Sequence, residues 1–483
     1  MNWQFYGRRD ELSQLGCILD RGRWFFAKVT GRRRIGKTSL IHRVLATSGR
    51  NQVLYLQVPD SDAAGVLSAA AEFYAMFDIG EPPPRTLSGL AESLAGLMRR
   101  GYVVAIDEFQ YFNRQALFEF NSHLQFQIDN LARDAGDVTG GLIVLGSIHA
   151  DMAALLEDRS APLFNRLTDQ IDLRHLDLAS VLEILREHAD DDPERLLLFW
   201  NLFEGVPKFY RDCFEQGMMK ADRRLLIERM FFLSSSPLRT EADNWFLREL
   251  RGRYDTILKY VATHPGCSNA EIVAHFSQLG ETQSSPVAAY VRILTERYGM
   301  IERLQPVFAP ARARSGRYYV RDNFLRSWLA ALATPTASVN FRPLPTLLDD
   351  ADRRLHIAEG QGFERLVRSL YEERSRKGLG DFNLTSHVAG FWDRKGTEID
   401  LVALDEGRQI VRFGTSKRNA ERLPGDMTRF EQHIDRFLSQ KKHLQEWTVQ
   451  KVALAPRITP ELRDALLRRG CLSEDLADLC RGL

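Results

Sequence analysis

Three things are scarce in this sequence, and each scarcity argues against a class of protein. The 483 residues carry a formal net charge of only +1, so no global field draws the chain toward nucleic acid or an anionic membrane. The five cysteines are scattered and form no CxxC pair, which argues against a disulfide framework or a zinc site and fits a reducing cytosol. The longest apolar cluster, "LLLFWNLF", is far shorter than the roughly 20 residues that cross a bilayer.

The remaining composition is that of a globular protein with several domains. Hydrophobic residues make up 44% of the chain and charged residues 27%, which is enough apolar material for substantial cores. At roughly 150 residues for each domain, the length predicts about three domains. The start of the chain, "MNWQFYGRRDEL", carries charges early and has no apolar core, so we expect no signal peptide. We therefore expect a cytoplasmic protein with no membrane partner.

Residues 24–174 alternate short apolar runs with helical stretches. The runs are "WFFAKVT", "QVLYLQV", "YVVAID", "GLIVLGS" and "DQIDL". Each is apolar nearly throughout, as expected of strands that are buried on both faces of a parallel sheet. Strands that alternate with helices indicate an α/β domain.

A phosphate-binding loop follows the first of these strands. The stretch "GRRRIGKTSL", residues 31–40, contains the pattern G-x-x-x-x-G-K-[ST] at Gly31, Gly36, Lys37 and Thr38. The glycines let backbone N–H groups face phosphate oxygens, the lysine reaches the β and γ phosphates, and the threonine hydroxyl ligates Mg²⁺. Because the loop also opens a predicted helix, the phosphates would meet a helix N-terminus. We predict that ATP and Mg²⁺ bind here.

Further site candidates follow the loop along the chain. In "YVVAIDEFQYF", Asp107 would hold the Mg²⁺ shell and Glu108 would act as general base toward the attacking water. Ser147, at the end of "GLIVLGS", is either a polar sensor of the γ-phosphate or an ordinary strand-end serine. Arg166 in "APLFNRL" either supplies positive charge to the transferring phosphoryl group or is simply solvated. Pro207 in "FEGVPKFY" either contacts the nucleotide from a helical lid or marks a helix-breaking turn.

Together these motifs resemble the archaeal-type ATPase family, a branch of the STAND group related to AAA+ proteins. The resemblance covers roughly residues 3 to 330 and rests on "FYGRRDEL", "GRRRIGKTSLI", "IDEFQYF", "LGSIHADM", "PLFNR" and "GVPKFY". It implies a slow ATPase that uses ATP as a switch. It also implies roles for individual residues: adenine binding near Phe5, Tyr6 and Arg8, nucleotide sensing by Arg166, and a nucleotide loop marked by Arg33, Arg34 and the GKTS run that ends at Ser39.

A second motif lies between about residues 254 and 322, where three short helices precede two strand-like runs around the basic tip "PARARSG". This arrangement resembles a winged helix-turn-helix, which that family also carries. If the segment binds DNA, arginines would contact phosphates from the recognition helix "SSPVAAYVRILTERYG" and from the wing. In this class the module also serves as an intramolecular lid or a protein contact. The DNA-contact candidates are Arg292, Arg297, Arg312, Arg314 and Arg317.

The C-terminal stretches "GTEIDLVAL" and "QIVRFGTSK" resemble the core of PD-(D/E)XK nucleases. Such sites bind Mg²⁺ through an aspartate at one strand end and an acid-x-Lys triplet on the next strand. Asp400, Lys417 and a helix glutamate, Glu364, match this pattern, but Thr415 replaces the second acid and supplies no charge for a metal. Glu398 shares a strand face with Asp400 and either compensates in part or is a solvated strand-end acid. We predict a nuclease-like domain whose cleavage is lost or impaired.

The predicted fold class is α/β: a P-loop, ASCE or AAA+-like parallel sheet with a helical lid, a winged helix-turn-helix and a C-terminal α/β nuclease-like domain. The predicted boundaries are 1–175 for the P-loop core, 176–250 for the lid, 251–332 for the winged helix, 333–346 for a linker and 347–483 for the nuclease-like domain. The predicted function is that of a Mg²⁺-dependent STAND or AAA+-type ATPase acting as a nucleotide-controlled switch. Two alternatives stay open: an ATP-gated DNA nuclease, and a non-hydrolysing nucleotide-binding scaffold or DNA-binding regulator. DNA, a protein partner and a second copy of the chain stay open as partners.

Overall fold

The computed structural model describes residues 3–47, 52–147, 149–243, 253–278, 284–310 and 313–483. The chain forms two compact units, which we describe separately. The N-terminal unit comprises Gly7–Leu176 and Val206–Lys208, and the C-terminal unit comprises Met1–Tyr6, Asp177–Gly205 and Phe209–Leu483. Within the described ranges, every helix is either too short or too polar to cross a bilayer.

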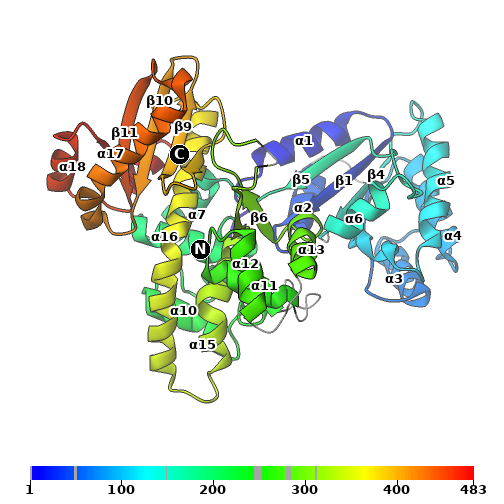
Figure 1. The fold of residues 1–483 in the computed structure, drawn as a ribbon. Coiled ribbons are helices and arrows are strands. Elements are labelled where there is room, and N and C mark those ends of the chain that lie inside the picture. The colour runs from blue at the N-terminus through cyan, green and yellow to red at the C-terminus, as the bar shows by residue number, and fades with distance from the viewer. Residues whose placement is uncertain (1–2, 48–51, 148, 244–252, 279–283, 311–312) are drawn as a thin grey trace. The chain divides into compact units, whose positions relative to one another are not determined.

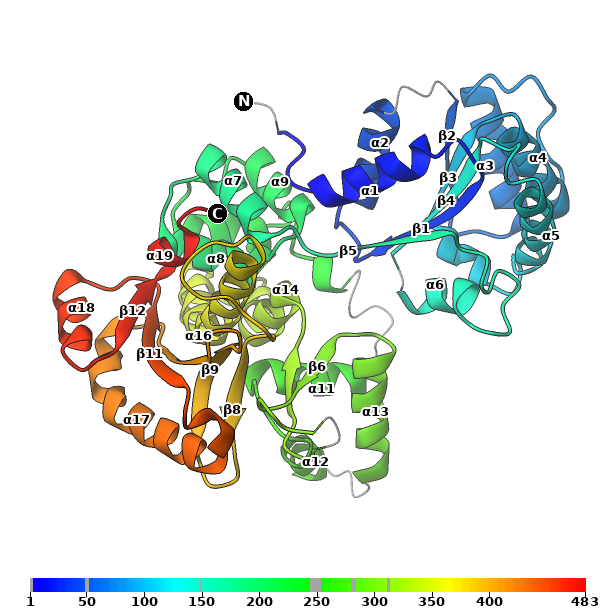
Figure 2. The same ribbon diagram turned by 90° about the horizontal axis from the view of Figure 1, so that it is seen from above.

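The N-terminal unit is built on a five-stranded sheet in the order β2-β3-β4-β1-β5, and all its paired strands are parallel. Figure 1 labels β1, β4 and β5 of this sheet, and Figure 2 labels all five strands. This sheet confirms the predicted α/β fold class. The order places β4 between β1 and β3, which is the ASCE arrangement that the sequence predicts. The strands are β1 (Phe25–Gly31), β2 (Val53–Gln57), β3 (Val103–Asp107), β4 (Gly141–Gly146) and β5 (Asp169–Leu173).

Helices cover both faces of this sheet (Figure 2). One face packs against α3, α4 and α5 through a core that includes Leu94, Val104, Phe120 and Leu142, whereas α1 and α2 lie on the other face. Burying each such side chain stabilises the unit by roughly 1.5–3 kcal/mol, so the helices fix the sheet and its edges firmly. The helices are α1 (Arg9–Asp20), α2 (Lys37–Thr47), α3 (Ala63–Met76), α4 (Leu87–Arg99), η1 (Phe109–Asn113), α5 (Glu119–Arg133) and α6 (His149–Leu156).

The C-terminal unit begins with a group of helices. They are α7 (Leu178–His188), α8 (Pro193–Phe203), α9 (Pro207–Glu215), whose first two residues belong to the N-terminal unit, α10 (Arg223–Ile227) and η2 (Glu228–Phe232). Glu359, on a later helix of the same unit, is almost fully buried and forms ion pairs with Arg223 of α10 and with Arg418 near the C-terminal sheet. A buried carboxylate is strongly destabilising unless it is paired with a cation. These two ion pairs therefore connect the helical region with the C-terminal sheet.

Three helices and a hairpin follow. They are α11 (Arg253–Thr263), α12 (Asn269–Gln278), α13 (Ser284–Glu296), and the antiparallel strands β6 (Ile301–Leu304) and β7 (Arg317–Val320). Ser268 caps α12: its Oγ accepts from the Glu271 N–H at 3.3 Å, and its own N–H donates to Glu271 Oε2 at 2.7 Å. This reciprocal pair is a capping box, which explains why the helix starts there.

Residues 333–346, for which composition predicts a linker, contain helical structure. They contain α15 (Ala333–Ala337) and the start of the 33-residue helix α16 (Leu344–Arg376), and they follow α14 (Asn323–Ser327) and η4 (Trp328–Leu332) without a break. Pro335 and Thr336 are buried. The Pro- and Thr-rich composition suggests an exposed segment, but packing against η4 and α16 places these residues in a helical turn instead.

The chain ends in a second, mixed sheet in the order β12-β11-β10-β9-β8. β8, β9 and β10 pair antiparallel, whereas β10, β11 and β12 pair parallel. Phe437 of α17 packs edge-on against Phe413 of β10, with ring centroids 5.2 Å apart. The elements are β8 (Ala389–Trp392), β9 (Glu398–Asp405), β10 (Ile410–Ser416), η5 (Ala420–Arg422), α17 (Leu423–Gln440), η6 (Lys442–Leu444), β11 (Thr448–Ala455), α18 (Pro460–Leu467), β12 (Leu472–Asp475) and α19 (Leu476–Cys480).

Gly140, directly before β4, has no room for a side chain. A Cβ there would lie 2.2 Å from the backbone oxygen of Met98 and 2.5 Å from that of Tyr102. We expect Gly140→Ala to lower the free energy of unfolding by ~1–3 kcal/mol, and the melting temperature by roughly 2–4 °C for each kcal/mol. Calorimetry measures both. Gly136→Ala is the matched control, because a Cβ there meets nothing within 4 Å; equal melting temperatures for the two variants would contradict this account.

Candidate functional site

The loop between β1 and α2 requires its two glycines for conformational reasons. Gly31 has φ +152° and Gly36 has φ +95°, which side-chain-bearing residues rarely adopt. A Cβ on Gly31 would also lie 2.7 Å from the backbone oxygen of Leu173 in β5. At Gly36 the nearest atom is Pro207 Cγ, 3.9 Å from the Cβ position, so Pro207 lies against the loop within the same unit. The structure therefore brings the predicted loop and the predicted Pro207 together.

Lys37 is the first residue of α2 and is buried, with 7% of its surface exposed. Its Nζ donates to the backbone oxygens of Gly31 at 3.0 Å and Arg32 at 3.2 Å, so the ammonium lies across its own loop. Burial lowers the pKa of Lys37 to about 8, the carboxylates of Asp107 and Glu108 oppose this shift, and Arg33 adds to it. The lysine is a cation whose charge is only partly compensated, which suits it to an anionic ligand.

Asp107, at the end of β3, is joined to the loop by a hydrogen bond. Its Oδ2 accepts from Thr38 Oγ1 at 2.7 Å and from Tyr55 Oη at 2.5 Å, and its Oδ1 accepts from the Glu108 N–H at 2.8 Å. Burial, and then the hydrogen bond to Asp107, raise the pKa of Tyr55, so this phenol stays protonated as a donor. A threonine hydroxyl beside a carboxylate is the oxygen set that Mg²⁺ prefers, so Thr38 and Asp107 fit the predicted metal role.

Glu108 lies next to Asp107 in a left-handed backbone conformation, with φ 57°. Backbone of this kind costs about 1 kcal/mol in a residue other than glycine and gathers at functional sites. Its Oε2 accepts from Gln110 Nε2, and Ser147 Oγ lies 3.4 Å from the same oxygen. The structure thus brings the predicted general base, Glu108, close to the predicted sensor, Ser147. Gln110 also contacts the Glu108 carboxylate.

The N-terminal candidates divide between the two units. Arg8 is buried in the N-terminal unit, where its Nη2 donates to the backbone oxygen of Ile35 in the loop at 3.1 Å. Tyr6 is buried in the C-terminal unit, where its hydroxyl contacts Glu187 at 2.8 Å and His188 at 2.6 Å on α7. Phe5 beside it is half-buried. Arg8 is therefore the member of this group with a direct contact to the loop.

The remaining nucleotide-site candidates lie near the loop or away from it. Arg33 and Ser39 are exposed, and Arg34 has a left-handed backbone with φ 65°. Arg166 forms a two-pronged ion pair with Asp129 of α5, with N–O distances of 2.8 and 3.0 Å. The predicted nucleotide sensor is thus paired with a carboxylate rather than with the loop.

Two functional contacts escape the motifs. Tyr55 lies two residues before the end of β2, and Gln110 lies in the short helix η1 after Glu108. Neither belongs to a phosphate-loop pattern, because their roles depend on which strands neighbour one another. The sequence offers one hint for each residue. Tyr55 places a hydroxyl within the largely apolar strand "QVLYLQV", and Gln110 is the polar residue in the otherwise aromatic "FQYF".

A second group of titratable residues lies in the C-terminal unit. Partial burial, and then the charge of Asp400 on β9, raise the pKa of Glu364 on α16, and burial likewise raises the pKa of Asp400. Asp400 Oδ2 accepts from the Ser416 N–H at 2.8 Å and lies 3.4 Å from Thr415 Oγ1. Lys417 instead pairs with Asp426 of α17 at 3.0 Å. The predicted residues Glu364 and Asp400 lie close enough to influence each other's pKa, and Asp400 and Lys417 already have partners within the chain.

One of the wing candidates, Arg317, is engaged inside the chain. Arg317 of β7 pairs with Glu398 of β9 at 2.5 Å, and its guanidinium lies 4.7 Å from the ring centre of Trp392. Trp392 Nε1 in turn donates to the backbone oxygen of Ser315 at 2.7 Å. Arg292 and Arg314 are exposed, Arg297 lies 5.6 Å from the Tyr298 ring, and Arg312 lies outside the described residues.

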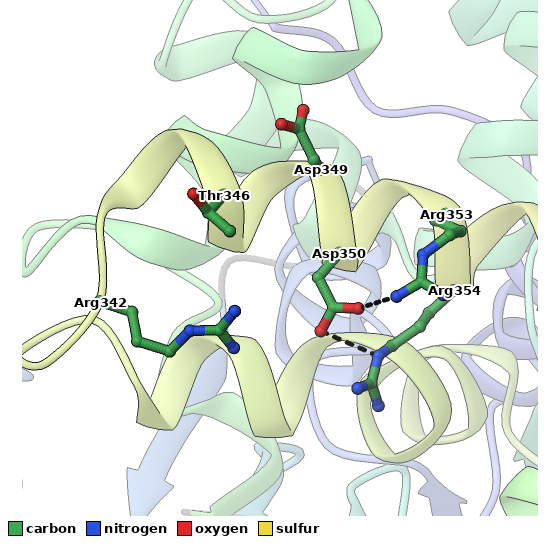
Figure 3. Close-up of a pocket in the computed structure, with 6 residues that line it drawn as sticks. All are labelled: Arg342, Thr346, Asp349, Asp350, Arg353 and Arg354. Atoms are coloured by element: carbon green, nitrogen blue, oxygen red, sulfur yellow. Dashed lines mark hydrogen bonds and ion pairs between the residues drawn. The ribbon is translucent and has the colours of Figure 1, made fainter.

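A surface hollow at the start of α16 offers a third group of charges (Figure 3). Asp350 accepts from both Arg353, at 2.5 Å, and Arg354, at 3.1 Å, and Asp349 pairs with Arg224. Because neighbouring acids already hold these arginines, the hollow carries little uncompensated charge, and none of the predicted site residues lines it. The lining residues are Arg342, Thr346, Asp349, Asp350, Arg353 and Arg354.

Comparison with known proteins supports the fold of the site. No family model matches the chain. An uncharacterized protein of Methanocaldococcus jannaschii is 23% identical over 419 residues, covering 85% of this chain and 86% of its own. The Walker-type ATPase of Pyrococcus abyssi superposes with a TM-score of 0.52 at 18% identity, covering 67% of this chain and 96% of that one. The chain therefore has the P-loop ATPase fold. The ORC2 protein of Aeropyrum pernix, in complexes with ADPNP and ADP, covers 74% of this chain and 96% of its own at 12% identity, but its TM-score of 0.34 supports no further comparison.

The pKa of Lys37 predicts how nucleotide affinity depends on pH. In the free protein this pKa is about 8, and only the protonated ammonium attracts phosphate. In EDTA we expect the affinity for ADP to be constant below that pH. Above it, the affinity should fall up to tenfold for each pH unit, because binding then requires uptake of a proton. Titration calorimetry in two buffers of different ionisation enthalpy measures the affinity for ADP and the number of protons taken up on binding, from about pH 7 to about pH 9.5.

The matched control for this measurement is Lys220→Ala, which removes an exposed lysine of the other unit. It should reproduce the wild-type pH profile, because Lys220 lies outside the N-terminal unit that carries the loop. An affinity that does not change with pH in the wild type would show that Lys37 is not the group that binds phosphate.

Proposed function

We propose that this protein binds ATP together with Mg²⁺ and hydrolyses it slowly, so that the nucleotide state acts as a switch. The observation that carries the proposal is the bond between Thr38 and Asp107, which joins the phosphate loop to the acid at the end of β3 at 2.7 Å. Lys37 lies across the same loop. The ammonium that would bind phosphate and the Thr38 and Asp107 oxygens that would bind a metal are therefore at the same edge of the sheet.

Each residue has a definite task in this proposal. Lys37 exchanges its bonds to the Gly31 and Arg32 carbonyls for bonds to phosphate oxygens, which compensates its charge. Thr38 and Asp107 would hold Mg²⁺, which when bound neutralises phosphate charge as the leaving group departs. Glu108 orients a water and takes its proton at a carboxylate oxygen. Arg8 and Pro207 stabilise the loop from outside.

Slow turnover is supported by the environment of Glu108. Its Oε2 accepts a hydrogen bond from Gln110 and lies 3.4 Å from Ser147 Oγ, so the carboxylate is engaged before any water arrives. A base in this state must exchange a partner for the water before it takes a proton. That exchange is a step that a regulatory change in the protein can favour or oppose, as a switch requires.

We further propose the predicted domain arrangement, with boundaries at 1–175, 176–250, 251–332, 333–346 and 347–483. The compact N-terminal unit ends its main segment at Leu176, next to the first of these boundaries. The helices α11 to α13 with the β6–β7 hairpin make up the proposed winged helix. Its wing is engaged by Glu398 and Trp392, which supports a role as an intramolecular contact over a role as a phosphate-binding surface.

Replacing the general base tests hydrolysis. We expect Glu108→Gln to release phosphate from ATP roughly 100- to 10,000-fold more slowly than the wild type, because general-base catalysis contributes that much. Nucleotide binding should persist, because Lys37 and Thr38 are untouched. Glu119→Gln, at the exposed start of α5, is the matched control and should retain the wild-type rate. Equal, near-zero release by wild type and Glu108→Gln would favour a non-hydrolysing scaffold.

The C-terminal domain is proposed to have lost cleavage. A neutral hydroxyl at Thr415 replaces the acid that would attract the metal, and the Ser416 N–H already donates to Asp400. We expect no nicking of supercoiled plasmid with Mg²⁺ or Mn²⁺ beyond that shown by Asp400→Ala. Nicking by the wild type that Asp400→Ala abolishes would instead establish the ATP-gated nuclease.

A further inference from the structure

We propose that Tyr55 is a positioning residue for Asp107, and through it for the divalent cation that accompanies the nucleotide. The inference deepens the proposed function and rests on it. It assigns a role to a side chain that belongs to neither the phosphate loop nor the acidic strand end. The observation behind it is the bond from Tyr55 Oη to Asp107 Oδ2 at 2.5 Å.

Strand order brings the two side chains together. β2 is the edge strand of the sheet and pairs in parallel with β3, so that Tyr55 lies opposite Ala105 and Gln57 lies opposite Asp107. A tyrosine is long enough to span this offset of two residues and to reach a carboxylate at the end of the neighbouring strand. The contact therefore depends on the pairing of β2 with β3.

Two hydroxyls share one carboxylate oxygen. Tyr55 and Thr38 both donate to Asp107 Oδ2, whereas Oδ1 accepts from the backbone N–H that follows. A carboxylate oxygen has two lone pairs in its plane, so these donors account for both of them. The orientation of the carboxylate is thus fixed by three bonds, from three separate segments of the chain.

The two hydroxyls differ in what they offer a cation. Thr38 would present an oxygen lone pair to the metal while its O–H still donates to Oδ2, because a hydroxyl has one donor and two acceptor lone pairs. Tyr55 is not among the proposed metal ligands, and its ring lies 4.7 Å from the ring of His42 on α2. The terminal torsion of an aspartate has broad minima, so a carboxylate that lacks the phenol is less fixed. The phenol therefore keeps Oδ2 facing the loop with or without a cation.

The test separates cation dependence from nucleotide affinity. The affinity for ADP is measured first in EDTA and then over a series of Mg²⁺ concentrations, for wild type, Tyr55→Phe and Tyr102→Phe. Tyr55→Phe retains the ring and its contact with His42 but removes the hydroxyl. Tyr102 precedes β3 at the opposite end of that strand from Asp107, so its variant controls for loss of a tyrosine hydroxyl in the same unit.

We expect Tyr55→Phe to bind ADP in EDTA as tightly as the wild type does. The Mg²⁺ concentration that gives half of the cation-dependent gain in affinity should rise roughly tenfold, because a hydrogen bond to a charged group is lost. Phosphate release from ATP should fall at low Mg²⁺ and recover when Mg²⁺ is raised. A merely structural role would lower the affinity in EDTA as well and would not be rescued by the cation.

Three results would overturn the inference. A half-effective Mg²⁺ concentration that is unchanged or lower in Tyr55→Phe, with the wild type behaving as proposed, would overturn this inference alone and leave the ATPase proposal standing. A wild type that binds no nucleotide, with or without Mg²⁺, would overturn both. A Tyr102→Phe variant with the same Mg²⁺ shift as Tyr55→Phe would show that the effect is not specific to the bond with Asp107.

Discussion

The carboxylate of Asp107 is the point on which the candidate site depends. In a parallel sheet all strands present their carboxyl ends at one edge, so residues that are far apart in sequence meet there. Asp107 ends β3, Thr38 follows β1, and Tyr55 lies near the end of β2. The hydrogen bonds among them turn this shared edge into one connected group, and Lys37 and Glu108 lie around it.

Much of this arrangement follows from local sequence. The five apolar runs predict β1 to β5 to within about two residues, because strands buried on both faces leave little doubt about their extent. The phosphate loop is predicted because glycine spacing and the GKT run encode backbone geometry directly. Fold class and loop are therefore readable before any contact is known.

The contacts between segments are not readable in this way. The pairing of Arg166 with Asp129, which places a predicted sensor beside a carboxylate, depends on how α5 lies on the sheet. Tyr55 depends on the order of strands, and Pro335 depends on burial against neighbouring helices. In each case the residue type permits several environments, and tertiary packing selects one. Composition alone therefore does not predict the helices that residues 333–346 contain.

In the C-terminal unit, cations and carboxylates largely satisfy one another. Arg317 pairs with Glu398, Lys417 with Asp426, and Arg418 with the buried Glu359. Any anionic ligand or metal that entered this region would first have to displace an existing partner, and an interaction of that kind contributes little net free energy. The pair of Arg317 with Glu398 joins the hairpin to the C-terminal sheet, and the pair of Arg418 with Glu359 joins that sheet region to α16, so two of the predicted remnant residues, Glu398 and Lys417, already have partners within the unit.

The path of the chain between the units limits how the protein can be divided. It leaves or enters the N-terminal unit after Tyr6, Leu176, Gly205 and Lys208, and the short return of Val206–Lys208 carries the proline that lies against Gly36. A fragment that stops at Leu176 would keep every strand of the parallel sheet and lose this proline. Cleavage at that point would separate the phosphate loop from Pro207, because this contact is encoded more than 30 residues after the end of β5 at Leu173.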